Sequence, residues 1–221
     1  MNTVIAADAD AQGYRNAMGQ LLVLYTQVDQ LIMEACAERI ATAPDLKAKL
    51  GLAKQVGDES RHVAIQREWM QCFGTSQAPL LSEAQQSTIR DHFRDLDWAD
   101  FLTDMYLCVE ALGSDAVEQV VPLADPGTRE SLRLPLQDEL DHVAFGVERL
   151  RQALAAMPAS DRQAHLEAIP TRINALGKVF LGMGLELRPL FEAVGADFDQ
   201  LIHSVQRRKT EVLDAVAVPC G

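Results

Sequence analysis

The sequence contains one short pattern twice, first as Asp58-Glu59-Ser60-Arg61-His62-Val63-Ala64 and again as Asp138-Glu139-Leu140-Asp141-His142-Val143-Ala144. Residues three apart lie on the same face of an α-helix, so each copy is able to direct one carboxylate and one imidazole toward a single point. Only two of the five histidines have a glutamate three residues before them, and both belong to this pattern. Two such points brought together would form a dinuclear metal site.

Two further glutamates stand alone within apolar stretches. Glu34 lies in the stretch 31–37, and Glu110 lies in the similar stretch 107–113. A buried carboxylate without a partner is costly or takes up a proton, and a bound cation would compensate it. The alternative is that both glutamates lie at a helix edge and reach water.

The repeated pattern favours the cation, because the combined inventory is four glutamates and two histidines from four helices. That is the ligand set of ferritin-like di-iron and di-manganese bundles. Carboxylate and imidazole together suit iron or manganese. The predicted metal ligands are Glu34, Glu59, His62, Glu110, Glu139 and His142.

The composition predicts a single all-α domain. The chain has 221 residues, of which 48% are hydrophobic and 5% aromatic, and a net charge of −12. This charge argues against a nucleic-acid partner and against a basic membrane-surface patch. Four scattered cysteines, without a C-x-x-C pair, exclude a zinc ribbon that the sequence alone would reveal. We find no signal peptide and no apolar run of membrane length, so we expect a cytoplasmic protein.

The pattern along the chain is helix after helix. Capping boxes at Ser82 and Ser160 and an Asp125-Pro126 pair mark helix starts. Pro135 either kinks the helix that carries the second motif or marks its true start. The expected helices are 14–41, 46–72, 82–93, from Asp95 or Asp97 to 120, 125–156, 161–193 and 197–215, with kinks or breaks at Pro170 and Pro189.

On these residues the chain resembles the ferritin-like superfamily of non-haem di-iron carboxylate proteins, over roughly residues 14–157. Its layout is most similar to the O2-activating members: ribonucleotide reductase R2-like proteins, bacterial multicomponent monooxygenases, the phenylacetyl-CoA epoxidase subunit and aldehyde-deformylating oxygenase. The first motif has the Asp-Glu-x-Arg-His form of the multicomponent monooxygenases, whereas the second has Asp141 where arginine is expected. The stretch 121–126 and the second motif are similar to aldehyde-deformylating oxygenase.

The resemblance implies a ferritin-like four-helix bundle with a crossover connection and additional C-terminal helices at about 160–215, all within one domain, 1–221. It implies two iron ions, or manganese, with O2 as co-substrate and no catalytic residue beyond the metal ligands. Asp58 and Asp138 would each accept a hydrogen bond from the metal-bound histidine of the opposite motif helix. The alternative is that these aspartates are exposed helix residues.

Three residues near Glu110 are candidates for a pocket. Tyr106, one turn before Glu110, would approach the metals as a redox or hydrogen-bonding group, or else serve as ordinary core. Gly113 stands where rubrerythrins carry a further glutamate. With Ser114, it would leave room beside the metals for O2 and substrate, or would permit close helix packing.

We therefore expect a di-iron monooxygenase or oxidase that oxidises a small, apolar organic substrate. Electrons would come from a separate ferredoxin or reductase, because the sequence has no flavin or iron–sulfur motif. A homodimer is a further expected assembly. Two alternatives stay open: a ferroxidase or peroxide-scavenging protein without an organic substrate, and a non-catalytic subunit that keeps the fold.

Overall fold

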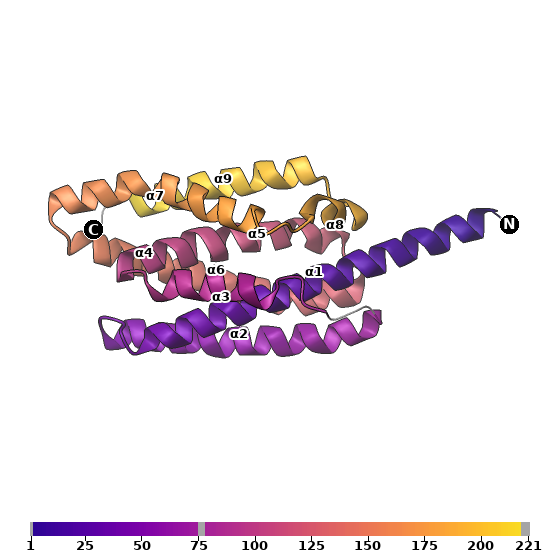
Figure 1. Cartoon of the computed structure of the whole chain (residues 1–221), viewed down its shortest axis with the longest axis horizontal. Coiled ribbons are helices and arrows are strands. Elements are labelled where there is room, and N and C mark those ends of the chain that lie inside the picture. Colours follow the sequence, from indigo (N-terminus) through magenta and orange to yellow (C-terminus); the bar gives the residue numbers. More distant parts are fainter. Residues whose placement is uncertain (1, 75–77, 218–221) are drawn as a thin grey trace.

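The structure is a computed structural model that describes residues 2–74 and 78–217; Cys220 lies outside them. All regular elements of these residues are helical, which confirms the all-α prediction (Figure 1). No helix among them is long and apolar enough to cross a membrane. Four long segments pack into a bundle: α1 (Asn2–Ile40), α2 (Leu46–Phe73), the continuous run α4 (Trp98–Leu102), η1 (Thr103–Glu110) and α5 (Ala111–Val120), and α6 (Pro126–Ala155). A short 3-10 turn, η2 (Val121–Leu123), precedes α6.

The crossover between the two halves of the bundle passes through α3 (Glu83–Arg94), which packs against α1. The Gln27 side chain on α1 donates to the Leu81 carbonyl at 3.0 Å and accepts from the Leu80 amide at 2.7 Å. The predicted capping box is present: Ser82 N–H donates to Gln85 Oε1 at 2.7 Å, and the Gln85 amide donates to Ser82 Oγ at 3.4 Å. These bonds anchor the connection to α1 and to itself at the point where α3 begins.

The C-terminal helices α7 (Ala159–Leu181), α8 (Leu187–Ala193) and α9 (Phe198–Ala217) lie on the side of the bundle opposite α2 (Figure 1). The predicted stretch 161–193 breaks before α8, in the segment that contains Gly184 (φ 72°), and not at Pro189. The predicted capping box at Ser160 is wrong, because α7 begins at Ala159 and Ser160 Oγ bonds to Asp161 instead.

The third bundle helix contains a π-helical segment, η1, that the sequence analysis did not predict. At its end the Ala111 N–H bonds to the Tyr106 carbonyl, five residues earlier. The π-helix is rare and is frequently found at functional sites. Glu110 is the last residue of η1, so this segment determines where a predicted ligand points.

Pro135 lies inside α6 and is buried, so it does not start that helix. The helix starts at Pro126, and the Asp125 side chain caps it by accepting from the Gly127 and Thr128 amides at 3.0 and 3.1 Å. The second motif therefore lies in the middle of a long helix.

Gly146, one turn after His142, is expected to be essential for packing. A Cβ there would lie 2.0 Å from Cγ of the Tyr106 ring, which is fully buried and has little room to move. We expect Gly146→Ala to lower the free energy of unfolding by about 2 kcal/mol, since overpacking a close-packed core forces side chains and backbone to shift. Chemical denaturation would measure this. Gly113→Ala is the matched control, because a Cβ at Gly113 meets nothing within 4 Å; an equal loss there would contradict the packing argument.

Candidate metal centre

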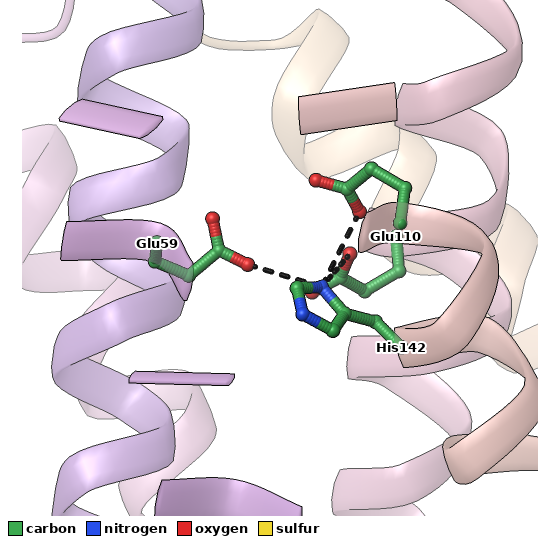
Figure 2. Close-up of side chains that lie close together, drawn as sticks. Glu59, Glu110 and His142 are labelled. Carbon is green, nitrogen blue, oxygen red and sulfur yellow. Dashed lines mark ion pairs between the residues drawn. The ribbon is translucent and has the colours of Figure 1, made fainter. Parts of the chain in front are cut away.

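The inner faces of three bundle segments bring four ligand-type side chains to one place. Glu59 comes from α2, Glu110 from the end of η1, and Glu139 and His142 from α6; one ligand atom of each lies within 4.8 Å of the others. Figure 2 shows Glu59 reaching from one helix toward His142 and Glu110 on the other side. His142 Nδ1 is 3.3 Å from Glu59 Oε1 and 3.6 Å from Glu110 Oε2.

A second group adjoins the first and shares Glu59. It consists of Asp29 from α1, Glu59 and His62, again with ligand atoms within 4.8 Å. His62 Nδ1 lies 3.1 Å from Glu59 Oε2, whereas His142 faces Glu59 Oε1. The two oxygens of one carboxylate therefore face the two groups, so Glu59 would help to hold a metal ion in each of them.

The chemistry of this donor set fits a pair of cations. Glu59 Oε1, Glu110 Oε2 and His142 Nδ1 are buried and have no hydrogen-bond partner among the described residues. Burial and the charge of Glu139 raise the pKa of Glu110 well above its usual range. Burial alone would lower the pKa of His62, but the hydrogen bond and the charge of Glu59 outweigh it and raise this pKa to about 9. Divalent cations would satisfy the unpartnered atoms and offset the excess negative charge.

Glu34 is not part of either group, in contrast to the sequence prediction. Its side chain is 31% exposed; Oε1 accepts from Gln30 at 2.9 Å, and Oε2 pairs with Arg90 of α3 at 3.4 Å. The compensating charge thus comes from an arginine that the crossover brings alongside, and no buried cation is needed.

Asp29 stands in the place predicted for Glu34. It is 8% exposed and accepts a hydrogen bond from Gln66 Nε2 at 2.7 Å. Five residues are about one and a half helical turns, so the side chains of Asp29 and Glu34 point to different sides of α1. The sequence did hold a signal: Asp29 precedes Glu59 by 30 residues, close to the 29 between Glu110 and Glu139, whereas Glu34 precedes it by 25.

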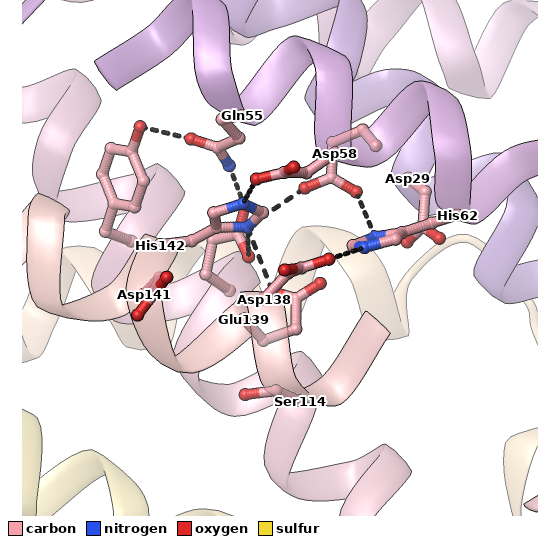
Figure 3. Close-up of polar contacts among 12 residues, drawn as sticks. Asp29, Gln55, Asp58, His62, Ser114, Asp138, Glu139, Asp141 and His142 are labelled. Atoms are coloured by element: carbon pink, nitrogen blue, oxygen red, sulfur yellow. Dashed lines mark hydrogen bonds and ion pairs between the residues drawn. The ribbon is translucent and has the colours of Figure 1, made fainter. Parts of the chain in front are cut away.

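The Nε2 atom of each histidine contacts an aspartate of the other motif helix (Figure 3). His62 Nε2 lies 3.0 Å from Asp138 Oδ2, and His142 Nε2 lies 3.2 Å from Asp58 Oδ2. Arg61 bonds to both aspartates, at 3.1 Å to Asp58 and 2.7 Å to Asp138. With both Nε2 atoms occupied, both Nδ1 atoms face the carboxylates.

Both aspartates are held in their charged form, although by different cations. Burial favours the neutral form of Asp58, but hydrogen bonds from Lys54 and His142 outweigh it and lower its pKa. For Asp138, hydrogen bonds from His62 and Arg61 outweigh burial in the same way. Asp141, which replaces the expected arginine of the second motif, is exposed and lies 3.7 Å from Lys54.

Tyr106 reaches the cluster through a residue that the sequence analysis missed, Gln55. The Tyr106 hydroxyl donates to Gln55 Oε1 at 2.5 Å, and Gln55 Nε2 donates to Glu110 Oε1. All three side chains are buried. Gln55 stands four residues before Glu59 on α2 and thus on the same helix face, which is the signal that could have identified it.

The two small residues after Glu110 do not form a shared pocket. Gly113 is exposed, and open space surrounds the place of a Cβ there, so it does not leave room beside the cluster. Ser114 instead lines a groove of about 420 Å³ between α5, α6 and α9. The apolar wall of this groove comes from α6: Leu140, Val143, Ala144 and Val147.

Solved structures with a similar fold include two oxidases. A Synechococcus protein with aldehyde deformylating oxidase activity has a TM-score of 0.71 at 18% identity, covering 93% of this chain and 92% of that one. An R2-like ligand-binding oxidase mutant with an aerobically reconstituted Mn/Fe cofactor has a TM-score of 0.66 at 15% identity, covering 93% and 81%. These similarities show the ferritin-like fold and confirm the predicted architecture.

Among curated protein sequences, no match was found. A family model described as a ferritin-like domain of actinomycetes matches residues 12–174, about three quarters of the chain and including every residue of both groups. The chain therefore belongs to this ferritin-like domain family.

Proposed function

We propose that this protein is an O2-dependent oxidoreductase with two metal ions, iron or manganese. The observation that carries the proposal is the pair of donor groups that share Glu59, in which three buried donor atoms have no hydrogen-bond partner among the described residues. The solved oxidases of similar fold support it. The proposed ligands are Asp29, Glu59, His62, Glu110, Glu139 and His142.

Bound here, two divalent iron or manganese ions would supply the electrons with which O2 is activated. The protein residues orient the donors. Asp138 and Asp58 hold the two imidazoles by Nε2 and leave Nδ1 toward the centre. Gln55 donates to Oε1 of Glu110 and leaves Oε2 of that carboxylate free to bind. The buried Tyr106 closes this side of the site against water.

We propose a small, apolar organic substrate, and the groove at Ser114 supports this choice. Ser114 follows Glu110 by one turn on the same run of helix, and the groove beside it has an apolar wall from α6. The wall begins at Leu140, directly after Glu139, and includes Val143, directly after His142. A separate ferredoxin or reductase would supply electrons, in the cytoplasm.

Metal binding and O2 consumption together test the proposal. We expect the full chain to bind two equivalents of Fe(II) anaerobically, measured by elemental analysis, and to consume O2 in the presence of a chemical reductant. A panel of apolar aldehydes and hydrocarbons, with product analysis, should show an oxidised product for at least one class. O2 consumption that yields only ferric iron and no organic product would indicate a ferroxidase instead. Failure to bind two ions would contradict the proposal as a whole.

A further inference from the structure

We propose that the outward face of α2 is the docking surface for a small acidic iron–sulfur protein that delivers electrons to the centre. This inference rests on the proposed function. Lys47, Leu50, Lys54, Gly57, Arg61 and Arg67 mark the face, which we call the α2 face. In Figure 1, α2 forms one edge of the molecule, opposite α7 and α9.

The α2 face is basic on an acidic protein. The chain has a net charge of −12, yet α2 contains five cationic and three anionic residues. Two of the three anions of α2, Asp58 and Glu59, are buried, and the third, Glu68, is exposed. Lys54 and Arg61 are paired with Asp141 and Asp138 of α6, so the uncompensated positive charge of the face lies on Lys47, Lys49 and Arg67, which form no salt bridge among the described residues. Lys47, Lys54 and Arg61 follow one another at intervals of seven residues and thus line one edge of the face. Charge complementarity of this kind steers an acidic partner and accelerates its association.

The same face has the shortest polar connections to both histidines. Arg61, whose side chain is 45% exposed, bonds to Asp138 at 2.7 Å, and Asp138 contacts His62 Nε2 at 3.0 Å. Lys54, 55% exposed, bonds to Asp58 at 2.8 Å, and Asp58 contacts His142 Nε2 at 3.2 Å. Each of the two histidines is thus two polar contacts from a cation on the surface. An electron donor seated here would lie close to the metals, where electron tunnelling is fastest.

The first turns and the middle of the α2 face permit a close approach. Leu46 and Leu50 are 71% and 61% exposed, the largest exposures among the large hydrophobic side chains of the described residues. Exposed apolar residues within a charged rim are typical of protein–protein interfaces. Gly57, between Lys54 and Arg61, has no atom within 4 Å of the place of a Cβ. A partner surface is therefore able to reach the α2 backbone beside Asp58.

The electron balance sets the number of docking events. Each reduced iron–sulfur protein transfers one electron to one trivalent metal ion and leaves oxidised. Two successive events return both ions to the divalent state. Release of the oxidised donor between the two events requires a weak complex, which a small apolar contact at Leu46 and Leu50 beside charged residues provides.

The test measures reduction of the iron-loaded, oxidised full chain in a stopped-flow instrument. The probe is a reduced acidic [2Fe–2S] ferredoxin of plant type. We expect Lys47→Glu/Arg67→Glu to lower the second-order rate constant at least ~10-fold at low ionic strength, and added salt to slow the wild type toward the variant. Both residues are exposed, and neither contacts the metal centre.

A matched control changes the net charge equally on the opposite side of the molecule. Arg162 and Lys178 on α7 are also exposed. The rate constant of Arg162→Glu/Lys178→Glu should stay within about twofold of the wild-type value, because the effect depends on local charge and not on net charge. Reduced methyl viologen, which needs no docking surface, should reduce all three proteins at the same rate.

Each other outcome overturns the inference. The inference is wrong if the two double variants change the rate constant equally, or if neither changes it. It is also wrong if the ferredoxin does not reduce the wild type. A wild-type dimer that Lys47→Glu/Arg67→Glu dissociates, seen by analytical ultracentrifugation, would assign the face to a second copy of the chain. If methyl viologen also fails to reduce the wild type, the proposed function fails, and with it this inference.

Discussion

Replacing Glu59 by glutamine is expected to remove both metal ions at once. The two carboxylate oxygens of Glu59 face the two donor groups. Glu59 is also the one residue that the two groups have in common among the described residues. Loss of outer partners of metal ligands typically weakens binding about 10- to 100-fold, and loss of a shared, charged ligand should cost more. Elemental analysis of anaerobically loaded protein should show the iron content fall from two ions per chain to near zero.

The stability of the metal-free Glu59→Gln protein makes this test specific. The substitution removes one of several crowded, buried negative charges, so the metal-free variant should unfold at the same temperature as the wild type or higher. The wild type should gain stability on adding Fe(II), and the variant should not. Glu68→Gln, on the exposed side of the same helix, is the control and should behave as the wild type. A Glu59→Gln protein that still binds two ions would contradict the shared role of Glu59.

The substitutions Asp29→Asn and Glu34→Gln should show which carboxylate of α1 is a metal ligand. Asp29 belongs to only one donor group, with Glu59 and His62, so its loss should leave about one tightly bound ion per chain. Glu34 is paired with Arg90 and Gln30 away from the centre, so Glu34→Gln should keep both ions. The asparagine can still accept the hydrogen bond of Gln66, which limits any structural disturbance.

Titration with Fe(II) under anaerobic conditions would count the ions in both variants. The reverse result, with the loss of an ion in Glu34→Gln and none in Asp29→Asn, would restore the ligand set predicted from the sequence. Because the two residues lie five positions apart on one helix, a general weakening of α1 would affect both variants alike. The difference between them therefore reports the ligand itself.

Much of the centre could be predicted from the sequence, because its strongest signals are local. The i, i+3 spacing within each motif determines that Glu59 and His62 share a helix face, and likewise Glu139 and His142. These four residues and Glu110 are the five predicted ligands that the structure brings together. The helical architecture followed from the same kind of periodic information.

The errors arose where the answer depended on a distant part of the chain. Glu34 resembled a buried, unpaired carboxylate because no cation stood near it in sequence, yet Arg90 reaches it from α3 across 56 positions. Asp29 was overlooked because it sits among polar neighbours, Gln27 and Gln30, and lacks the apolar surroundings used as the criterion. Its burial depends on how α1 packs against α2, which the local pattern does not specify.

The π-helical segment η1 has a consequence for the comparison of related sequences. A π-helix arises where an α-helix accommodates one additional residue, and each residue of an α-helix turns the next by about 100°. In relatives whose third helix is α-helical throughout, the residue equivalent to Glu110 would lie one position closer to Thr103. An alignment without a gap would then pair Glu110 with the wrong residue. Single-residue gaps between Thr103 and Glu110 should therefore be allowed when carboxylates of this family are traced from one chain to another.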